Sequence, residues 1–89
     1  MHHILFYEYE GEDIVERRRP YREEHLAMVF GERDAGRIVL AGALGDPPHS
    51  AAIVFRDTEP GAIEAFAQAD PYVQNGLVGS WRIEPWNIV

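Results

Sequence analysis

Residues 37–56 read RIVLAGALGDPPHSAAIVFR, which is two apolar runs separated by a short loop rich in glycine and proline. The first run covers Arg37–Leu44, and the second covers Ala51–Arg56, which contains two adjacent β-branched residues. Apolar runs of this length, bounded by turn residues, are typical of β-strands. Gly45–Pro48 is a turn sequence. The stretch therefore predicts two consecutive strands, the first of them buried on at least one face.

A helical pattern precedes these strands. Residues at positions i, i+3, i+4 and i+7 are spaced as on one face of an α-helix: Leu26, Val29, Phe30 and Arg33. Pro20 suits the first turn of such a helix, because its fixed backbone angle is already helical. Gly36 suits the position after the last turn. We therefore expect a helix with one buried stripe.

A second helix is predicted after the strands. Asp57 or Thr58 can cap it, and Pro60 lies just inside its start. Its apolar stripe consists of Ile63, Phe66 and Ala67. The Asp70–Pro71 pair is expected to end it, because the residue before a proline is driven out of the helical region.

The remaining apolar stretches predict two outer strands. Ile4–Tyr9 is the first strand of the chain, and Leu77–Ile83 is the last, which Pro85 is expected to end. The order βαββαβ is ferredoxin-like: an α+β domain over residues 1–89, with an antiparallel sheet and both helices on one face. The other face of the sheet would be uncovered and too apolar for water. A second copy packed sheet to sheet is the simplest cover, and it would give a dimeric α+β barrel.

Composition narrows the classes of function. The formal net charge is −7, from 15 Asp and Glu against 8 Lys and Arg, and an acidic domain binds nucleic acid poorly. The basic run Arg17–Arg19 is interpreted as a solvated helix face. No apolar stretch approaches the ~20 residues that cross a bilayer, and no signal-peptide pattern is present. The chain has no cysteine, and neither a metal nor a cofactor is predicted. The cytoplasm is the expected compartment.

Four phrases of the sequence resemble the YciI-like (YCII-related) family, in that family's order and at about its spacing. They are Arg22-Glu23-Glu24-His25-Leu26, Gly36-Arg37 followed by Leu40-Ala41-Gly42, Asp70-Pro71-Tyr72-Val73 with Gly76-Leu77, and Trp81-Arg82-Ile83-Glu84-Pro85-Trp86. Together they cover almost the whole chain. The sequence departs from the family at Gly42–Gly45, where proline usually follows the first glycine, and in its short loop Asp46–Ser50. A relative's substrate is therefore not carried over.

The resemblance implies a pocket that holds His25 and Asp70 as a catalytic pair. It also implies isomerisation or elimination on a small cyclic or phenolic substrate, with no cofactor. The candidate substrate-binding residues are Arg22, Tyr72, His49 and Ser50.

Physical chemistry supports the pair independently. A carboxylate that accepts one imidazole N–H fixes the tautomer and raises the basicity of the other nitrogen, which makes a general base. Arg22, about one turn before His25, could place a cation beside it. The alternative is that Asp70 only caps backbone N–H groups of the turn at Tyr72–Val73, with His25 an ordinary boundary histidine.

Other side chains are open to two interpretations. His49 could close over the pocket or be a solvated loop histidine, and Ser50, directly after it, is not spaced as a nucleophile with its base. The aromatic residues of the outer strands could line a pocket, although packing on the sheet is the simpler interpretation: Tyr7, Tyr9, Trp81 and Trp86.

Two functions from different classes remain. One is an enzyme that moves a proton with His25, and the other is a non-enzymatic small-molecule-binding or structural dimer. The geometry of the pocket separates them. An enzyme needs one nitrogen of His25 free and facing a cavity of roughly 300 Å³ or more, whereas a structural pair would be packed shut.

Overall fold

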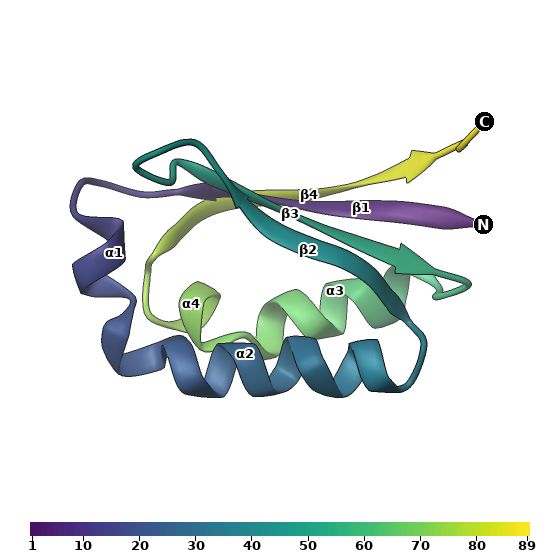
Figure 1. Ribbon diagram of the computed structural model, residues 1–89, viewed down its shortest axis with the longest axis horizontal. Coiled ribbons are helices and arrows are strands. Elements are labelled where there is room, and N and C mark those ends of the chain that lie inside the picture. The colour runs from purple at the N-terminus through teal and green to yellow at the C-terminus, as the bar shows by residue number, and fades with distance from the viewer.

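In the computed structural model, which describes residues 1–89, four strands form one antiparallel sheet in the order β2-β3-β1-β4. The strands are β1 (His2–Tyr9), β2 (Ile38–Leu44), β3 (Ser50–Arg56) and β4 (Val78–Trp86). The helices are α1 (Ile14–Arg17), α2 (Arg19–Asp34), α3 (Pro60–Ala69) and α4 (Pro71–Gln74). All four helices lie on one face of the sheet (Figure 1). This arrangement confirms the predicted α+β, ferredoxin-like fold.

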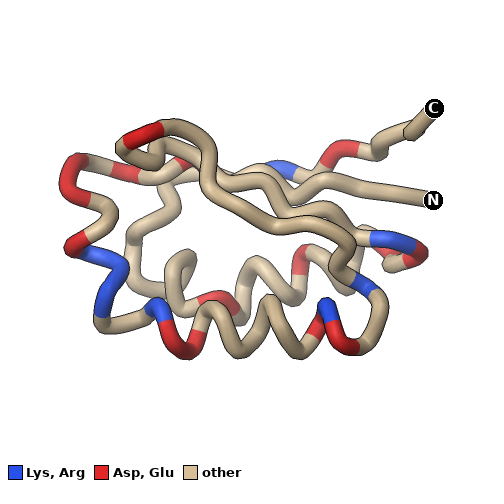
Figure 2. The backbone as a smooth tube through the Cα atoms, viewed as in Figure 1, with Lys and Arg blue, Asp and Glu red and all other residues tan.

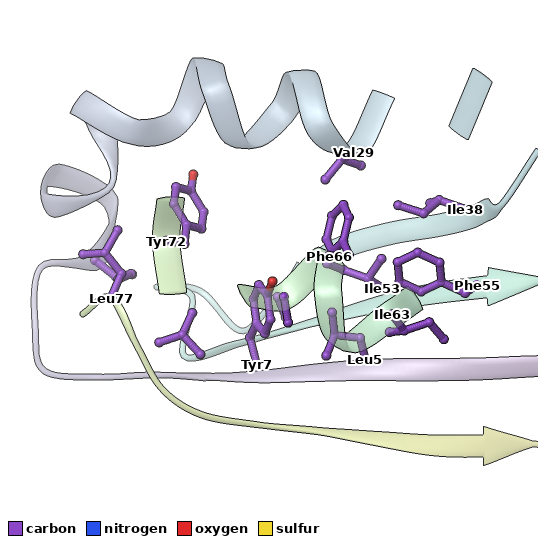
Figure 3. Close-up of a cluster of buried hydrophobic side chains, with 14 residues drawn as sticks. Leu5, Tyr7, Val29, Ile38, Ile53, Phe55, Ile63, Phe66, Tyr72 and Leu77 are labelled. Atoms are coloured by element: carbon purple, nitrogen blue, oxygen red, sulfur yellow. The ribbon is translucent and has the colours of Figure 1, made fainter. Parts of the chain in front are cut away.

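The core lies between the sheet and α3. Leu5 and Tyr7 alternate with outward residues on β1 and point toward the helices (Figure 3), and neither is exposed. Phe55 on β3 meets Phe66 on α3 edge to face, with ring centroids 5.4 Å apart. Ile63, also fully buried, fills the space between these layers. The predicted apolar stripe of α3 is thus the part of that helix that forms the core.

The longer helix, α2, packs more loosely than its periodicity predicts. Val29 is its one buried residue, whereas Phe30 is 43% exposed and the Arg33 guanidinium lies 4.6 Å from the Phe30 ring centre. The predicted stripe therefore overestimates the burial of α2. The physical reason is a cavity between α2 and strands β2 and β3, which is described below.

Two local predictions differ from the structure. The N-cap position of α3 is Glu59, whose side chain makes no capping hydrogen bond, and not Asp57 or Thr58. Asp57 adopts a left-handed backbone with φ 49°, and the Thr58 hydroxyl donates to the Arg56 carbonyl. Pro85 does not end the last strand, which continues to Trp86. The strand β4 is at the edge of the sheet. Proline, which has no backbone N–H, is tolerated on an edge strand because one side of that strand has no neighbouring strand to bond.

The short helices α1 and α4 were not predicted. Each is four residues long, which is too short to show a helical period in the sequence. The predicted end of α3 is confirmed, because Asp70 leaves the helical region with ψ 124° and then serves as the N-cap of α4. No helix of the structure combines the length and the apolar character needed to cross a membrane.

The face of the sheet opposite the helices is uncovered. Leu40 is 66% exposed, Leu44 is 44% exposed and Trp86 is 42% exposed. Leu40 and Leu44 pair across the ladder with Val54 and Ser50 of β3, and so belong to the face that alternates with the buried one. The sheet therefore presents an apolar surface to solvent in the single chain.

We expect Ile63→Ala to lower the free energy of unfolding by about 2–5 kcal/mol. The substitution leaves a cavity under the sheet, and the surrounding side chains can fill it only partially. Urea denaturation followed by circular dichroism measures this. The control is Ile88→Ala, at a side chain that is 51% exposed, which should change the stability by less than about 0.5 kcal/mol. Equal effects of the two substitutions would contradict the proposed position of the core.

Candidate functional site

The centre of the site is the carboxylate of Asp70, which is fully buried where α3 ends and α4 begins. It accepts hydrogen bonds from three elements. The Tyr7 hydroxyl of β1 donates to Oδ2 at 2.8 Å, and the Tyr72 backbone N–H of α4 donates to Oδ1 at 2.9 Å. Nδ1 of His25, on α2, lies 2.9 Å from Oδ2 and 3.0 Å from Oδ1. These donors compensate the buried carboxylate for its lost water.

His25 is held on two sides. Its Nδ1 bonds Asp70, and its ring stacks on that of Tyr72, with centroids 4.0 Å apart and an angle of 8° between the planes. Because a carboxylate can only accept, Nδ1 carries the hydrogen and Nε2 keeps a lone pair. Nε2 makes no hydrogen bond within the protein, and the side chain is 13% exposed. The contact expected between His25 and Asp70 is present, and Asp70 also caps the turn at Tyr72.

Tyr7 is a member of this cluster that sequence reasoning missed. The sequence favours packing on the sheet for its ring, and the ring is in the core, but its hydroxyl donates a hydrogen bond to the Asp70 carboxylate. Burial, together with the adjacent Asp70, raises the pKa of Tyr7 far above its ordinary value, so the phenol keeps its proton as a donor. A tyrosine on the buried face of a strand usually has a hydrogen-bond partner for its hydroxyl. The alternation of β1 could therefore have indicated that Tyr7 contacts a buried polar group.

A cavity of about 250 Å³ lies beside the pair, between α2 and the sheet, and His25, Tyr72 and Arg22 line it. This volume is slightly below the value of roughly 300 Å³ set for an enzyme pocket. Its wall is mostly apolar, and representative wall residues are Leu26, Val29, Phe30, Ala41, Ala43 and Ile53. The pair is therefore not packed shut, because one edge of the His25–Tyr72 stack faces an open cavity.

Tyr72 contributes an unusual polar atom to the cavity. The residue is 1% exposed and its hydroxyl is buried without any hydrogen-bond partner. Burial raises the pKa of Tyr72, while the nearby guanidinium groups of Arg22 and Arg18 act in the opposite direction. The neighbouring Tyr9 also lines the cavity, and burial raises its pKa too.

His49 and Ser50 form a separate cluster that does not line this cavity. Nδ1 of His49 lies 2.7 Å from Oγ of Ser50, which donates to Oε2 of Glu8 at 3.0 Å. Ala51 lines the cavity, so its neighbour Ser50 points to the opposite face of the sheet. The His49 ring packs where a side chain on Gly45 would stand, which makes it part of the β2–β3 loop.

The other charged residues form no further site of metal-ligand type. No group of three or more His, Cys, Asp or Glu side chains is arranged around a possible ion position.

We expect Tyr7→Phe to lower the free energy of unfolding by about 1–3 kcal/mol, since Asp70 loses a donor that water cannot replace. The parent protein should also lose stability as the pH rises above ~10, because Tyr7 ionises readily only when unfolded, and this loss should be smaller in the variant. Urea denaturation across this pH range measures both effects. Tyr21→Phe is the control, since the Tyr21 hydroxyl makes no hydrogen bond in the protein. A Tyr7→Phe protein as stable as this control would refute the buried contact.

No curated protein matches the sequence. Among solved structures, a 5-chloro-2-hydroxyhydroquinone dehydrochlorinase from Burkholderia phenoliruptrix, in complex with 2,5-dihydroxybenzoquinone, is similar with a TM-score of 0.81. The match covers 98% of this chain and 94% of that chain at 16% sequence identity, so it shows a shared fold. The YCII-related domain family matches residues 1–87. The chain therefore belongs to the YCII-related domain family.

Proposed function

We propose that the protein is a cofactor-independent enzyme in which His25, held by Asp70, transfers a proton on a small cyclic or phenolic substrate. The reaction would be an isomerisation or the elimination of a leaving group. Arg22 and Tyr72, which line the same cavity, would bind the substrate. We assign the enzyme to the cytoplasm, which suits a chain without cysteine.

The observation that carries this proposal is that only one of the two ring nitrogens of His25 is hydrogen-bonded within the protein. Nδ1 is bound to a buried carboxylate at 2.9 Å, while Nε2 is free in a ring that lines a cavity. A histidine with only a structural role would be expected to use both nitrogens or to lie against solvent. The Asp70 carboxylate favours the imidazolium that forms when Nε2 takes a proton.

The chemistry requires no redox step. Nε2 would take a proton from a carbon activated by an adjacent carbonyl group. Returning that proton to another carbon completes an isomerisation, and departure of an anion from the neighbouring carbon completes an elimination. A general base of this kind contributes about 10²–10⁴-fold to such a step. The similar solved structure is named as a dehydrochlorinase, so the fold accommodates elimination chemistry in that protein.

The test measures proton transfer without knowledge of the natural reaction. Hydroxylated aromatics, cyclic ketones and lactones are incubated with the protein in D₂O, and deuterium incorporation at carbon is followed by NMR. We expect deuterium incorporation into compounds that fit the cavity. His25→Gln should lower the rate of this incorporation by about 10²–10⁴-fold. Glutamine is chosen because its amide can still donate to Asp70.

The matched control is His49→Gln, because His49 lies outside the cavity and should leave the rate unchanged. An exchange rate that survives His25→Gln would rule out His25 as the base. Ligands that bind and stabilise the protein, but exchange no proton, would favour the alternative function of a small-molecule-binding protein.

We also propose that two copies associate through the uncovered faces of their sheets, as expected for a dimeric α+β barrel. The support is the exposed apolar set on that face, in which Leu40 is 66% exposed, together with the absence of any helix there (Figure 1). A two-fold symmetric contact would bury the same residues on both copies. An occupant of another kind would need its own apolar face of similar shape.

Leu40→Glu should dissociate this dimer, because it brings an extra pair of like charges into a symmetric interface. Light scattering coupled to size exclusion should give twice the 10.1 kDa chain mass for the parent and one chain mass for the variant. Val15→Glu, at a 39% exposed position on α1, is the control and should remain dimeric. A parent protein that elutes with the mass of one chain would disprove the association.

A further inference from the structure

The cations of this chain are distributed unevenly. All eight are arginines, and four of them lie between residues 17 and 22, where α1 meets α2. Figure 2 shows this cluster as blue segments at one end of the molecule, whereas the other four arginines are spread over the rest of the chain. The side chains of two of these four arginines at the α1–α2 junction bond other groups of the protein. Arg17 donates to the backbone carbonyls of Glu10 and Glu12, and Arg19 pairs with Glu16 at 2.9 Å.

The other two arginines, Arg18 and Arg22, are not paired with an acidic residue. Neither guanidinium makes an ion pair, and both line the cavity beside His25, where the Arg22 guanidinium lies close to the Tyr72 hydroxyl. Their spacing of four residues brings them to the same side at the start of α2. Their positive charges act on the groups that line the cavity. Both charges lower the pKa values of Tyr9 and Tyr72, against the rise that burial causes. In a protein of net charge −7, two unpaired cations at one cavity are conspicuous.

The Tyr72 hydroxyl is a second indication of a ligand. It is buried in the wall of the same cavity, and no protein group accepts a hydrogen bond from it. Leaving a buried hydroxyl unpaired is unfavourable, and a ligand atom that accepts a hydrogen bond removes that cost. Because Tyr72 stays protonated, it would be a donor. The polar side chains that line the cavity are Tyr9, Arg18, Arg22, His25 and Tyr72, and no carboxylate is among them.

We propose that the substrate is an anion: a small ring compound with its negative charge on a planar oxygen-bearing group, bound by Arg18, Arg22 and the Tyr72 hydroxyl. This inference rests on the proposed function for the location of the site, and adds the charge of the substrate. Guanidinium groups bind planar oxyanions through paired, charge-assisted hydrogen bonds. The apolar wall formed by residues such as Leu26 and Ile53 would contact the ring. The charged group would thus fix the ring's orientation relative to Nε2 of His25.

The test compares ligands of similar size and shape that differ in charge. The first pair is 4-hydroxybenzoate and 4-hydroxybenzamide, and the second is 4-nitrophenol, at a pH where it is ionised, and 4-nitroanisole. Dissociation constants are measured by NMR titration of the intact protein. We expect the anion of at least one pair to bind on the order of tenfold more tightly than its neutral partner. The pair that shows the preference distinguishes a carboxylate from an ionised hydroxyl.

Matched arginine variants assign the preference to its residues. Arg22→Met should remove most of the preference for the anion, while Arg19→Met, which changes the net charge equally at an exposed position outside the cavity, should keep it. Tyr72→Phe should weaken the anion more than the neutral compound. Equal binding of both members in both pairs, no binding up to about 10 mM, or equal losses in the two arginine variants would overturn the inference.

The outcome is separable from that of the proposed function. Binding of the anion does not require the base, so His25→Gln should keep the preference for charge even though it loses deuterium exchange. An anion preference without exchange in the parent protein would leave this inference standing and refute the enzyme. Exchange of neutral compounds, with no preference for anions, would do the reverse.

Discussion

The buried carboxylate of Asp70 is the interaction on which the site depends. It joins β1 through Tyr7, α2 through His25 and α4 through Tyr72, so three segments far apart in the sequence meet at one group. A carboxylate without water is stable only when donors surround it, and removing one hydrogen-bond donor of such a cluster costs about 1–3 kcal/mol. The folding of the domain and the alignment of His25 therefore have a common cause.

The cavity exists because α2 does not settle fully onto the sheet. Val29 is buried, but Phe30 is 43% exposed and the arginine-rich start of the helix faces the opening. In the energetics of packing this is a loss, since a helix with a wider buried stripe would be more stable. Such an unfilled space, lined by a histidine and two cations, is the form expected of the ligand site proposed above.

The separate position of His49 and Ser50 follows from the alternation of a strand. Ala51 faces the cavity, so Ser50 must face the other side of the sheet, where it donates to Glu8. A difference of one residue thus decides whether a polar side chain reaches the site. The same alternation places Leu5 and Tyr7 together on the buried side of β1. Only the hydroxyl of Tyr7 distinguishes its role from that of Leu5.

The sequence by itself determined the order of the elements, the ferredoxin-like sheet and the contact between His25 and Asp70, because these depend on periodicity, on proline and glycine positions and on four family phrases. It misjudged the end of β4 at Pro85 and the cap of α3, since a proline's effect depends on whether its strand lies at an edge, and capping depends on the backbone at Glu59. Only the tertiary structure decided that Tyr7 bonds Asp70, that Tyr72 keeps an unpaired hydroxyl and that Arg18 joins Arg22 at the cavity. The physical reason is that hydrogen bonding and burial are properties of neighbours in space. A local pattern can show which face of an element a side chain occupies, but it cannot show which group lies opposite.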